Sequence, residues 1–196
     1  MSLRETQAFF ASRAAGWEER FPDDEPRYVL AVRSLAIEPA ATVLDAGCGT
    51  GRALPILRRA VGIRGRVIGL DATPEMLAEA ARRGRGAAAG LVLGDGNHLP
   101  FRTPAFGAIL SAGYVPHLDS PQVGLRELAR VAIGGARLAI FHPIGRAALA
   151  ARHGGHPSED DPLSPVQLPG LLESSGWRLE SLDDGDDRYL ALAVRA

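Results

Sequence analysis

The chain is 196 residues long, 46% hydrophobic and 23% charged, with a formal net charge of −1 at pH 7. This length predicts one compact domain with a substantial core. The near-neutral charge argues against nucleic acid or an anionic membrane surface as a partner, because both recognise a basic face. No run of about 18 apolar residues is present and the first ten residues lack the apolar core of a signal peptide, so we expect no membrane segment.

The use of cysteine and of basic residues indicates the cellular context. Cys48 is the only cysteine, which excludes an internal disulfide and a zinc site built on cysteines. All 22 basic residues are arginine, and alanine is abundant. This composition is typical of a GC-rich genome, and a cytoplasmic bacterial protein is expected.

Residues 1–39 precede the first expected strand and predict a helical cap. Apolar side chains recur there at roughly helical spacing, with charged residues between them: Phe9, Phe10, Ala14, Trp17 and Phe21. Pro22 and Pro26 interrupt this pattern, and a second short helix is expected after them. The segment is either an amphipathic cap packed on the core or a lid over a ligand, with Trp17 or Tyr28 facing the site.

The stretch from Val43 to Gly51, VLDAGCGTG, organises the rest of the chain. A buried strand over residues 42–46 runs into a turn with glycines at alternate positions, where a ligand can approach bare main chain. A dinucleotide site requires a further glycine at the position of Arg52. Asp45 stands before the glycines, and its charge would repel a pyrophosphate but attract an ammonium or sulfonium group.

This form of turn resembles the first motif of the class I S-adenosylmethionine-dependent methyltransferases, of the small-molecule type related to ubiquinone and menaquinone biosynthesis. The resemblance implies that S-adenosylmethionine is the cofactor and that it is bound by Asp45, Gly47, Cys48, Gly49 and Gly51. Cys48 is interpreted as a small buried filler of the turn. Such enzymes often carry an N-terminal segment over the pocket, which favours the lid and a cofactor contact from Trp17.

After the turn, a helix is expected over residues 52–60 and a second buried strand over residues 66–71. Asp71 ends this strand, where a carboxylate can accept hydrogen bonds from both hydroxyls of an adenosine ribose. Ala72 follows it in the expected site. The next helix carries Met76 in its first turn, and this thioether either packs on an adenine ring or belongs to the core.

A third short strand is expected over residues 90–93, and Asp95 and Gly96 follow it. The Asp95 carboxylate can accept a hydrogen bond from an adenine amino group, and Gly96 lets the backbone approach the purine. This matches the adenine motif of the family, in which an acid is followed a few residues later by Leu-Pro-Phe, here residues 99–101. Asn97 lies between them and is included with the cofactor residues.

A fourth strand is expected over residues 106–113, and its end lies at the ligand crevice because open α/β sheets bind ligands beyond the carboxyl ends of their strands. Ser111 and its small neighbours leave room for the methionyl part of the cofactor. Tyr114 and His117 follow as the first choices for contact with the methyl acceptor, although His117 could only anchor the loop. His117 or His142 can act as a base near pH 7 if the acceptor is a hydroxyl.

The next segment predicts a helix, a glycine stop and a fifth strand. The helix covers residues 121–131 and stops at the glycine pair at 134–135, and the strand ends at His142. The family has a similar block, usually with a proline at the position where Ile133 stands here. The departure concerns the rigidity of the turn and not the chemistry.

Residues 145–162 show no apolar period and are expected to be a loop that shapes the acceptor pocket. His153 and His156 have H-x-x-H spacing there but no partner on a rigid element, so no metal site is expected. A helix over residues 163–175 and two strands joined by a tight acidic turn end the chain. Strands joined so closely must be antiparallel.

Together these features predict an α/β fold with a Rossmann-like, doubly wound sheet of seven strands, mostly parallel with an antiparallel C-terminal hairpin. Residues 1–39 are the helical cap or lid, and residues 40–196 are the S-adenosylmethionine-binding methyltransferase domain. The implied activity is transfer of a methyl group to an oxygen, nitrogen or carbon nucleophile of a small-molecule acceptor, by in-line displacement. The protein is expected to be a monomer or homodimer.

Three alternatives remain open. A regulatory protein that binds S-adenosylmethionine without catalysis would have the same glycines and acids. A nicotinamide-dependent reductase is argued against by the missing glycine. A nucleic-acid methyltransferase of the amino-methylating type would end the fourth strand in Asn-Pro-Pro-Tyr, whereas SAGYVPHL stands here.

Overall fold

The computed structural model describes residues 2–20, 24–102 and 104–196. Phe21 and Pro22, which belong to the expected cap pattern, lie outside the described residues. The centre of the fold is a seven-stranded sheet with strand order β3-β2-β1-β4-β5-β7-β6. Its strands are β1 (Thr42–Ala46), β2 (Arg66–Asp71), β3 (Gly90–Leu93), β4 (Phe106–Ala112), β5 (Ala132–His142), β6 (Trp177–Asp184) and β7 (Tyr189–Arg195).

The pairing within the sheet confirms the predicted topology. Strands β3, β2, β1, β4 and β5 are parallel neighbours, whereas β7 is antiparallel to both β5 and β6. Parallel neighbours need crossover connections, and the last two strands are antiparallel because only a short turn joins them. A parallel sheet is covered on both faces, which is why the strand sequences are continuous apolar runs and could be located accurately.

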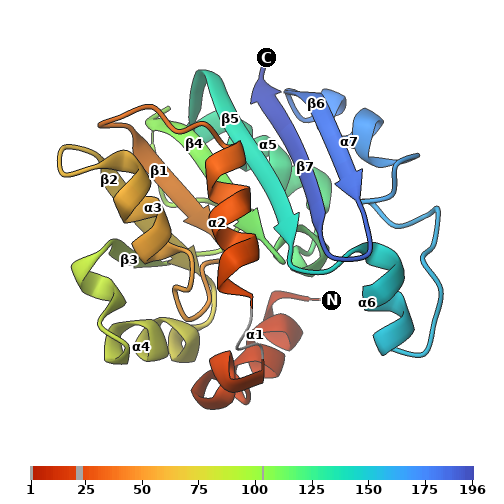
Figure 1. The fold of residues 1–196 in the computed structure, drawn as a ribbon, viewed down its shortest axis with the longest axis horizontal. Helices are drawn as coiled ribbons and strands as arrows, with labels where there is room; N and C mark the ends of the chain where they lie inside the picture. Colours follow the sequence, from red (N-terminus) through yellow and green to blue (C-terminus); the bar gives the residue numbers. More distant parts are fainter. Residues whose placement is uncertain (1, 21–23, 103) are drawn as a thin grey trace.

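Helices cover both faces of the sheet (Figure 1). Helices α2 (Glu25–Ser34) and α3 (Leu54–Val61) pack on one face, and α5 (Pro121–Val131) and α7 (Leu168–Ser174) pack on the other. Each face has its own apolar cluster, with Leu57 of α3 in one and Leu128 of α5 in the other. The chain is therefore the doubly wound domain that its alternation of strands and helices predicts.

The N-terminal segment lies beneath the carboxyl ends of the parallel strands (Figure 1). It comprises α1 (Leu3–Ala11) and the 3₁₀ helices η1 (Ala14–Gly16) and η2 (Glu18–Arg20), and it packs on α4 (Pro74–Arg82). Gln7 Nε2 donates to the Ala72 carbonyl at 2.8 Å, and Thr6 Oγ1 donates to the His117 carbonyl at 3.4 Å. These two hydrogen bonds tie α1 to segments that follow β2 and β4.

The segment 145–162, expected to be a loop, contains helix α6 (Arg146–Arg152). Its alanine-rich sequence favours a helix, but it shows no apolar period because the helix fully buries none of its residues. The Arg146 side chain anchors it, with Nε 2.8 Å from the Asp161 carboxylate. The Arg146 N–H also donates to the Asp184 carboxylate at 2.9 Å, so the start of α6 is fixed to the end of β6.

Two other boundaries differ from expectation. Strand β5 begins at Ala132, directly after α5, so the glycine pair lies inside the strand and is not a helix stop. The pairing of β5 with β4 shifts register here, and Gly135 permits the irregularity with a φ of +78°. Helix α7 starts later than the expected residue 163, because Ser164 Oγ accepts a backbone N–H at 3.1 Å in a turn that precedes the helix.

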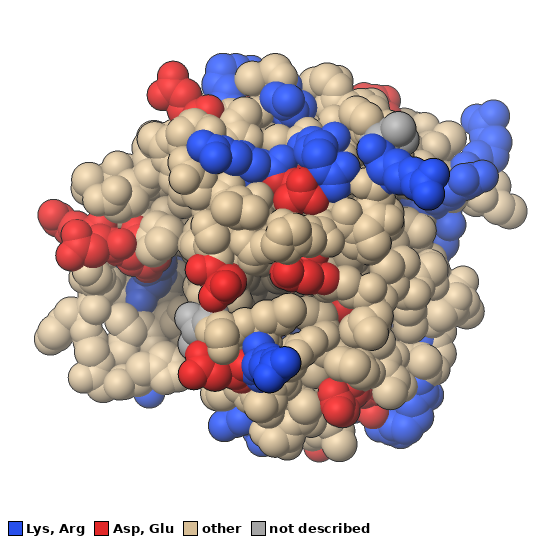
Figure 2. Space-filling model, turned by 180° about the vertical axis from the view of Figure 1, so that it is seen from behind, with Lys and Arg blue, Asp and Glu red and all other residues tan. Residues whose placement is uncertain are grey.

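The face of the molecule seen in Figure 2 carries both signs of charge. Basic side chains form a row along its upper margin, and acidic side chains lie close below that row. This face is therefore not uniformly basic. Within residues 2–20, 24–102 and 104–196, no helix is both long and apolar enough to cross a membrane.

The buried hydroxyl of Tyr189 gives a test of the C-terminal packing. Tyr189 is 1% exposed and its hydroxyl donates to the Leu163 carbonyl at 2.8 Å. The change Tyr189→Phe leaves that carbonyl without its donor, so we expect the free energy of unfolding in urea to fall by about 1–3 kcal/mol. Val166→Ala, at an exposed position, is the control and should leave it unchanged. Equal stability of Tyr189→Phe and the wild type would contradict this role.

Candidate cofactor and acceptor site

A cavity of about 550 Å³ opens at the carboxyl ends of the parallel strands, between the sheet and the N-terminal segment. Its size is within the range of small-molecule sites. Expected site residues from several elements meet on its wall. They are Trp17, Asp45, Gly47, Cys48, Gly49, Asp71, Ala72, Met76, Asp95, Gly96, Asn97, Tyr114, His117 and His142.

The glycine turn after β1 is held against β2. The N–H groups of Gly47 and Cys48 both donate to the Leu70 carbonyl, at 2.8 and 2.9 Å. Gly47 and Gly49 have φ angles of +73° and +54°, in the left-handed region that favours glycine. The Cys48 side chain is buried against Gly69 of β2, and burial raises the pKa of its thiol. Cys48 thus has the packing expected of a filler.

Gly51 and Ser111 were expected at the cofactor, and the structure places both off the cavity wall. Gly51 packs against Leu54 and the stem of Arg85, with a φ of +81°. Ser111 is fully buried in β4, and its Oγ has no hydrogen-bond partner among the described residues. For Ser111 the reason is geometric: successive side chains of a strand point to opposite faces, and its neighbour Ala112 is the one that lines the cavity.

Tyr114 lies in the part of the cavity lined by the glycine turn, and not at the acceptor end where we expected it. Its ring packs on Gly47 and its hydroxyl on Gly96, and a Cβ on either glycine would overlap this side chain. Burial, followed by the charges of Asp71 and Asp95, raises the pKa of Tyr114. The buried hydroxyl has no hydrogen-bond partner within the described part of the chain, so it is available to a ligand.

Asp45 is the polar group that most requires a ligand. The residue is 1% exposed, and its Oδ1 has no hydrogen-bond partner within the described ranges. Burial, with a smaller effect from the negative charge of Asp71, raises the pKa of Asp45 to about 7. A buried carboxylate without a partner is unfavourable, and a cation placed against it would offset that cost.

Asp71 and Asp95 lie at the ends of the two neighbouring strands and already order backbone around them. The two Asp71 oxygens accept from the N–H groups of Gly49 and Thr73, both at 2.8 Å. Burial raises the pKa of Asp71, although these hydrogen bonds oppose the rise. Asp95 accepts from the Asn97 N–H at 2.9 Å. A carboxylate has about four acceptor positions, so both groups can still accept from hydroxyl or amino donors.

Met76 and Asn97 both line the cavity, but Asn97 also has a structural role. Met76 is 2% exposed and lines the cavity from the first turn of α4. Asn97 also lines it, but its Nδ2 donates to the Ser120 carbonyl at 2.9 Å. The Asn97 amide therefore ties the loop after β3 to the start of α5.

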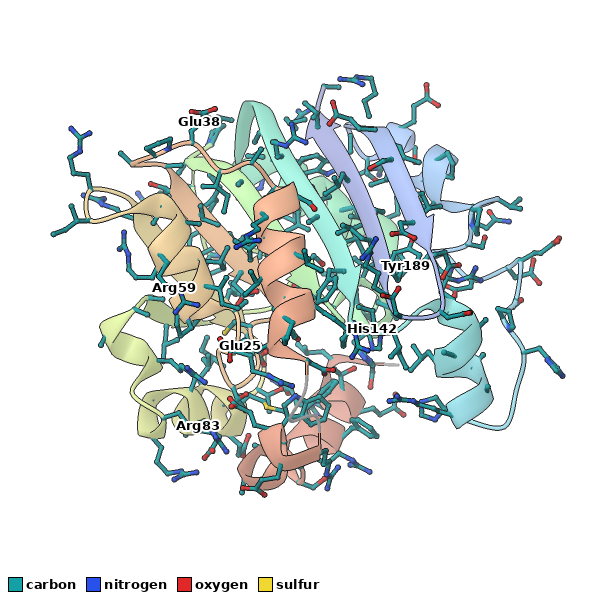
Figure 3. All side chains as sticks on the ribbon, in the orientation of Figure 1. Glu25, Glu38, Arg59, Arg83, His142 and Tyr189 are labelled. Atoms are coloured by element: carbon teal, nitrogen blue, oxygen red, sulfur yellow. The ribbon has the colours of Figure 1, made fainter. Side chains whose placement is uncertain are left out.

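Two histidines stand at the other end of the cavity. His142 lies at the lower end of β5, on the side where α1 and α6 lie (Figure 3). Its Nδ1 lies 2.9 Å from the Ile144 carbonyl oxygen and 3.3 Å from the Ile144 nitrogen, so Ile144 offers this ring nitrogen both an acceptor and a donor. His117 packs edge-on against Phe10, with ring centroids 4.9 Å apart. Burial lowers the pKa of both imidazoles, and the charge of His142 lowers that of His117 further, so both are neutral at pH 7.

The walls around the histidines come from the N-terminal segment and from α6. Trp17 lies edge-on to Phe10, with centroids 5.5 Å apart. Sequence reasoning missed several residues of these walls, among them Leu3, Arg13, Ile144, Leu149 and Arg152. No motif marks them, because only the tertiary fold brings α6 and α1 to one cavity (Figure 1).

The two histidines of the 145–162 segment do not converge. His153 lies on the cavity wall, and His156 does not. Among the residues that the structure describes, no three His, Cys, Asp or Glu side chains gather where they could hold a metal ion.

Comparison with known proteins identifies the family of this chain. Residues 44–140 match the family described as Methyltransferase domain. A 2-phytyl-1,4-naphtoquinone methyltransferase of Thermosynechococcus vestitus is 35% identical over 174 residues, which cover 76% of this chain and 77% of that protein. The protein of that name from Synechococcus elongatus is 40% identical over 117 residues, 57% of this chain and 50% of the relative. A solved SAM dependent methyltransferase from Aquifex aeolicus superposes with a TM-score of 0.69 at 23% identity, over 100% of both chains.

The fold and cavity define an α/β protein with a small-molecule site at the carboxyl ends of its strands. The chain belongs to the class I S-adenosylmethionine-dependent methyltransferases, as its glycine turn indicated. It covers between 32% and 50% of the length of three of the curated relatives that it matches. S-adenosylmethionine is the cofactor of this family, and the residues present fit it, because the buried Asp45 oxygen lacks a partner among the described residues.

The raised pKa of Asp45 predicts a pH-dependent affinity for the cofactor product, S-adenosylhomocysteine, whose ammonium group is cationic. Below pH 7 the carboxyl must lose a proton before it can pair with a cation, so affinity should fall by up to about tenfold per pH unit. Titration calorimetry between pH 5.5 and 8 measures this. Asp45→Asn should bind more weakly at pH 8 and lose the slope. Asp119→Asn, at an exposed carboxylate on the same cavity, should retain it; a slope unchanged in Asp45→Asn would contradict the assignment.

Proposed function

We propose that this protein transfers a methyl group from S-adenosylmethionine to a small-molecule acceptor. The observation that carries the proposal is the Asp45 carboxylate, which lines the cavity and is buried, and whose Oδ1 lacks a hydrogen-bond partner among the described residues. Such a group favours a cationic ligand. When bound, S-adenosylmethionine supplies a methyl group activated by the positive charge of its sulfur. Membership of the family supports the same activity.

In this proposal the carboxylates at three strand ends bind different parts of the cofactor. Asp45 serves the cationic methionyl part, Asp71 accepts from the ribose hydroxyls, and Asp95 accepts from the adenine amino group. Their order across the sheet, β1, then β2, then β3, supports a ligand that lies across the three strands. The buried Tyr114 hydroxyl is a further hydrogen-bond donor for the cofactor. The sequence alone predicts instead that Tyr114 contacts the methyl acceptor.

Supporting residues for the cofactor come from the segments that flank these carboxylates. They include Gly47, Cys48, Gly49, Ala72, Met76, Gly96, Asn97 and, from the N-terminal segment, Trp17. Residues 1–39 then act as a cap or lid on the domain formed by residues 40–196. Closing such a site excludes water and strengthens electrostatic interactions within it.

The acceptor occupies the end of the cavity that contains His117 and His142. A neutral imidazole can take the proton of a hydroxyl acceptor, and Nε2 of His142 does so in the tautomer whose Nδ1 donates to the Ile144 carbonyl. For a carbon or amine nucleophile the two rings orient the acceptor without removing a proton. His117 is our first choice for this contact, because it faces the N-terminal segment through Phe10.

Apolar walls favour an apolar acceptor. Leu3, Phe9 and Leu149 line the cavity together with the histidines, and the arginines Arg13 and Arg152 lie on the same walls. Two of the relatives are named for a phytyl-naphthoquinone, which is also apolar. We therefore propose an apolar, ring-containing methyl acceptor. We also propose that the protein is bacterial and cytoplasmic, that it acts as a monomer or homodimer, and that it has no nucleic-acid partner.

Labelled cofactor tests the proposal directly. The protein is incubated with methyl-labelled S-adenosylmethionine and a metabolite extract, and products are followed by mass spectrometry. We expect label in a small apolar compound. Binding of S-adenosylhomocysteine without any labelled product would favour the alternative of a regulatory protein without catalysis, and absence of binding would contradict both.

Replacement of His117 separates acceptor handling from cofactor binding. We expect His117→Ala to lower turnover by about 10²–10⁴-fold, the usual contribution of a positioned acid or base, with little change in cofactor affinity. Turnover and calorimetric affinity are measured on the same preparation. His156→Ala, away from the cavity, is the matched control. Equal losses of turnover and of affinity in His117→Ala would count against its role.

A further inference from the structure

Glu18 joins the N-terminal segment to the glycine turn. It belongs to η2, directly after the cavity residue Trp17, and its side chain is 17% exposed. The Thr50 hydroxyl donates to Glu18 Oε1 at 2.9 Å. Thr50 lies between the second and third glycines of the turn and is 1% exposed. This partly buried hydrogen bond connects residues 32 positions apart in the sequence, so the tertiary fold and not local structure makes it.

The second carboxylate oxygen of Glu18, Oε2, forms ion pairs with two arginines. Arg83 Nη1 lies 3.3 Å and Arg85 Nη2 lies 3.4 Å from Glu18 Oε2. Both arginine side chains are largely buried, 23% and 25% exposed. Arg83 follows α4 and points toward the N-terminal segment (Figure 3). Hydrogen bonds between charged groups in such surroundings are stronger than neutral ones.

Arg85 makes a second connection from Glu18 to the turn. A Cβ built on Gly51 would lie 3.0 Å from Arg85 Cγ and 3.2 Å from Arg85 Cβ, so the Arg85 stem packs directly on the third glycine. Glu18 therefore supports the turn at two points, through the Thr50 hydroxyl and through the stem of the arginine it pairs with.

We propose that Glu18 is a positioning residue for cofactor binding, through which closure of the N-terminal segment and the binding-competent shape of the glycine turn depend on each other. Glu18 acts through Thr50 and Arg85 and need not touch the cofactor. The coupling is reciprocal: a ligand that holds the turn stabilises η2, and an ordered η2 improves ligand affinity. This inference rests on the proposed function, because it takes the turn to be the cofactor site.

Variants of the two partners test the proposal by calorimetric titration of the full chain with S-adenosylhomocysteine. Thr50→Val removes the hydroxyl with little change of shape, and Glu18→Ala removes the acceptor. We expect each to weaken binding by about tenfold, and the double variant to lose no more than Glu18→Ala alone, because Glu18→Ala already removes the hydrogen bond that Thr50→Val removes. Glu18→Gln keeps an oxygen for Thr50 and should recover most of the affinity. Glu19→Ala, the adjacent exposed glutamate, is the control and should bind like the wild type.

Hydrogen exchange distinguishes positioning from a purely structural role. We expect S-adenosylhomocysteine to slow amide exchange over residues 14–20 in the wild type and in Glu19→Ala, and to lose this effect in Thr50→Val. Lower melting temperatures with unchanged affinity and unchanged exchange protection would overturn the proposal, as would additive losses in the double variant. A wild type that does not bind S-adenosylhomocysteine overturns both this inference and the proposed function. A wild type that binds it while Thr50→Val binds equally well overturns only the role of Glu18.

Discussion

The burial of acidic groups at the ends of adjacent strands is the constraint on which the rest of this structure depends. Asp45 lies one residue before the end of β1 and Asp71 ends β2, its parallel neighbour, and burial raises the pKa of both. Asp71 is compensated by backbone N–H donors, whereas one oxygen of Asp45 has no partner in the described residues. The ligand-free protein thus carries an electrostatic cost that a cation can offset, and this links the stability of the fold to the chemistry of its cofactor.

The N-terminal segment reaches this acidic end of the sheet through polar contacts with loop residues. Gln7 binds the carbonyl after Asp71, Thr6 binds the carbonyl of His117, and Glu18 binds the hydroxyl of Thr50. Each of these three groups belongs to, or is next in sequence to, a residue that we propose binds the cofactor or the methyl acceptor. These contacts place the segment over the cavity.

The two ends of the cavity differ in their polar groups, and we propose that one end binds the cofactor and the other binds the methyl acceptor. Carboxylates and the Tyr114 hydroxyl lie at the end formed by the turn, and two neutral imidazoles with apolar neighbours lie at the end formed by α1 and α6. The first end is built by the sheet that defines the family. The second is built by α1 and α6, which lie outside the matched residues 44–140 together with His142.

The sequence by itself determined the sheet, the family and most of the cofactor wall. Strands β1, β2 and β3 agree with prediction because buried parallel strands are continuous apolar runs, and Asp45, Asp71 and Asp95 line the cavity because a carboxyl-terminal strand end has only one place in such a sheet. Only the tertiary structure decided which neighbouring side chains face the ligand. Gly51 and Ser111 lie off the cavity wall, and the Tyr114 side chain packs on Gly47 and Gly96. The alanine-rich helix α6 lies against the end of the cavity proposed for the acceptor. The local sequence does not predict these placements, because each depends on contacts between segments that are distant in the chain.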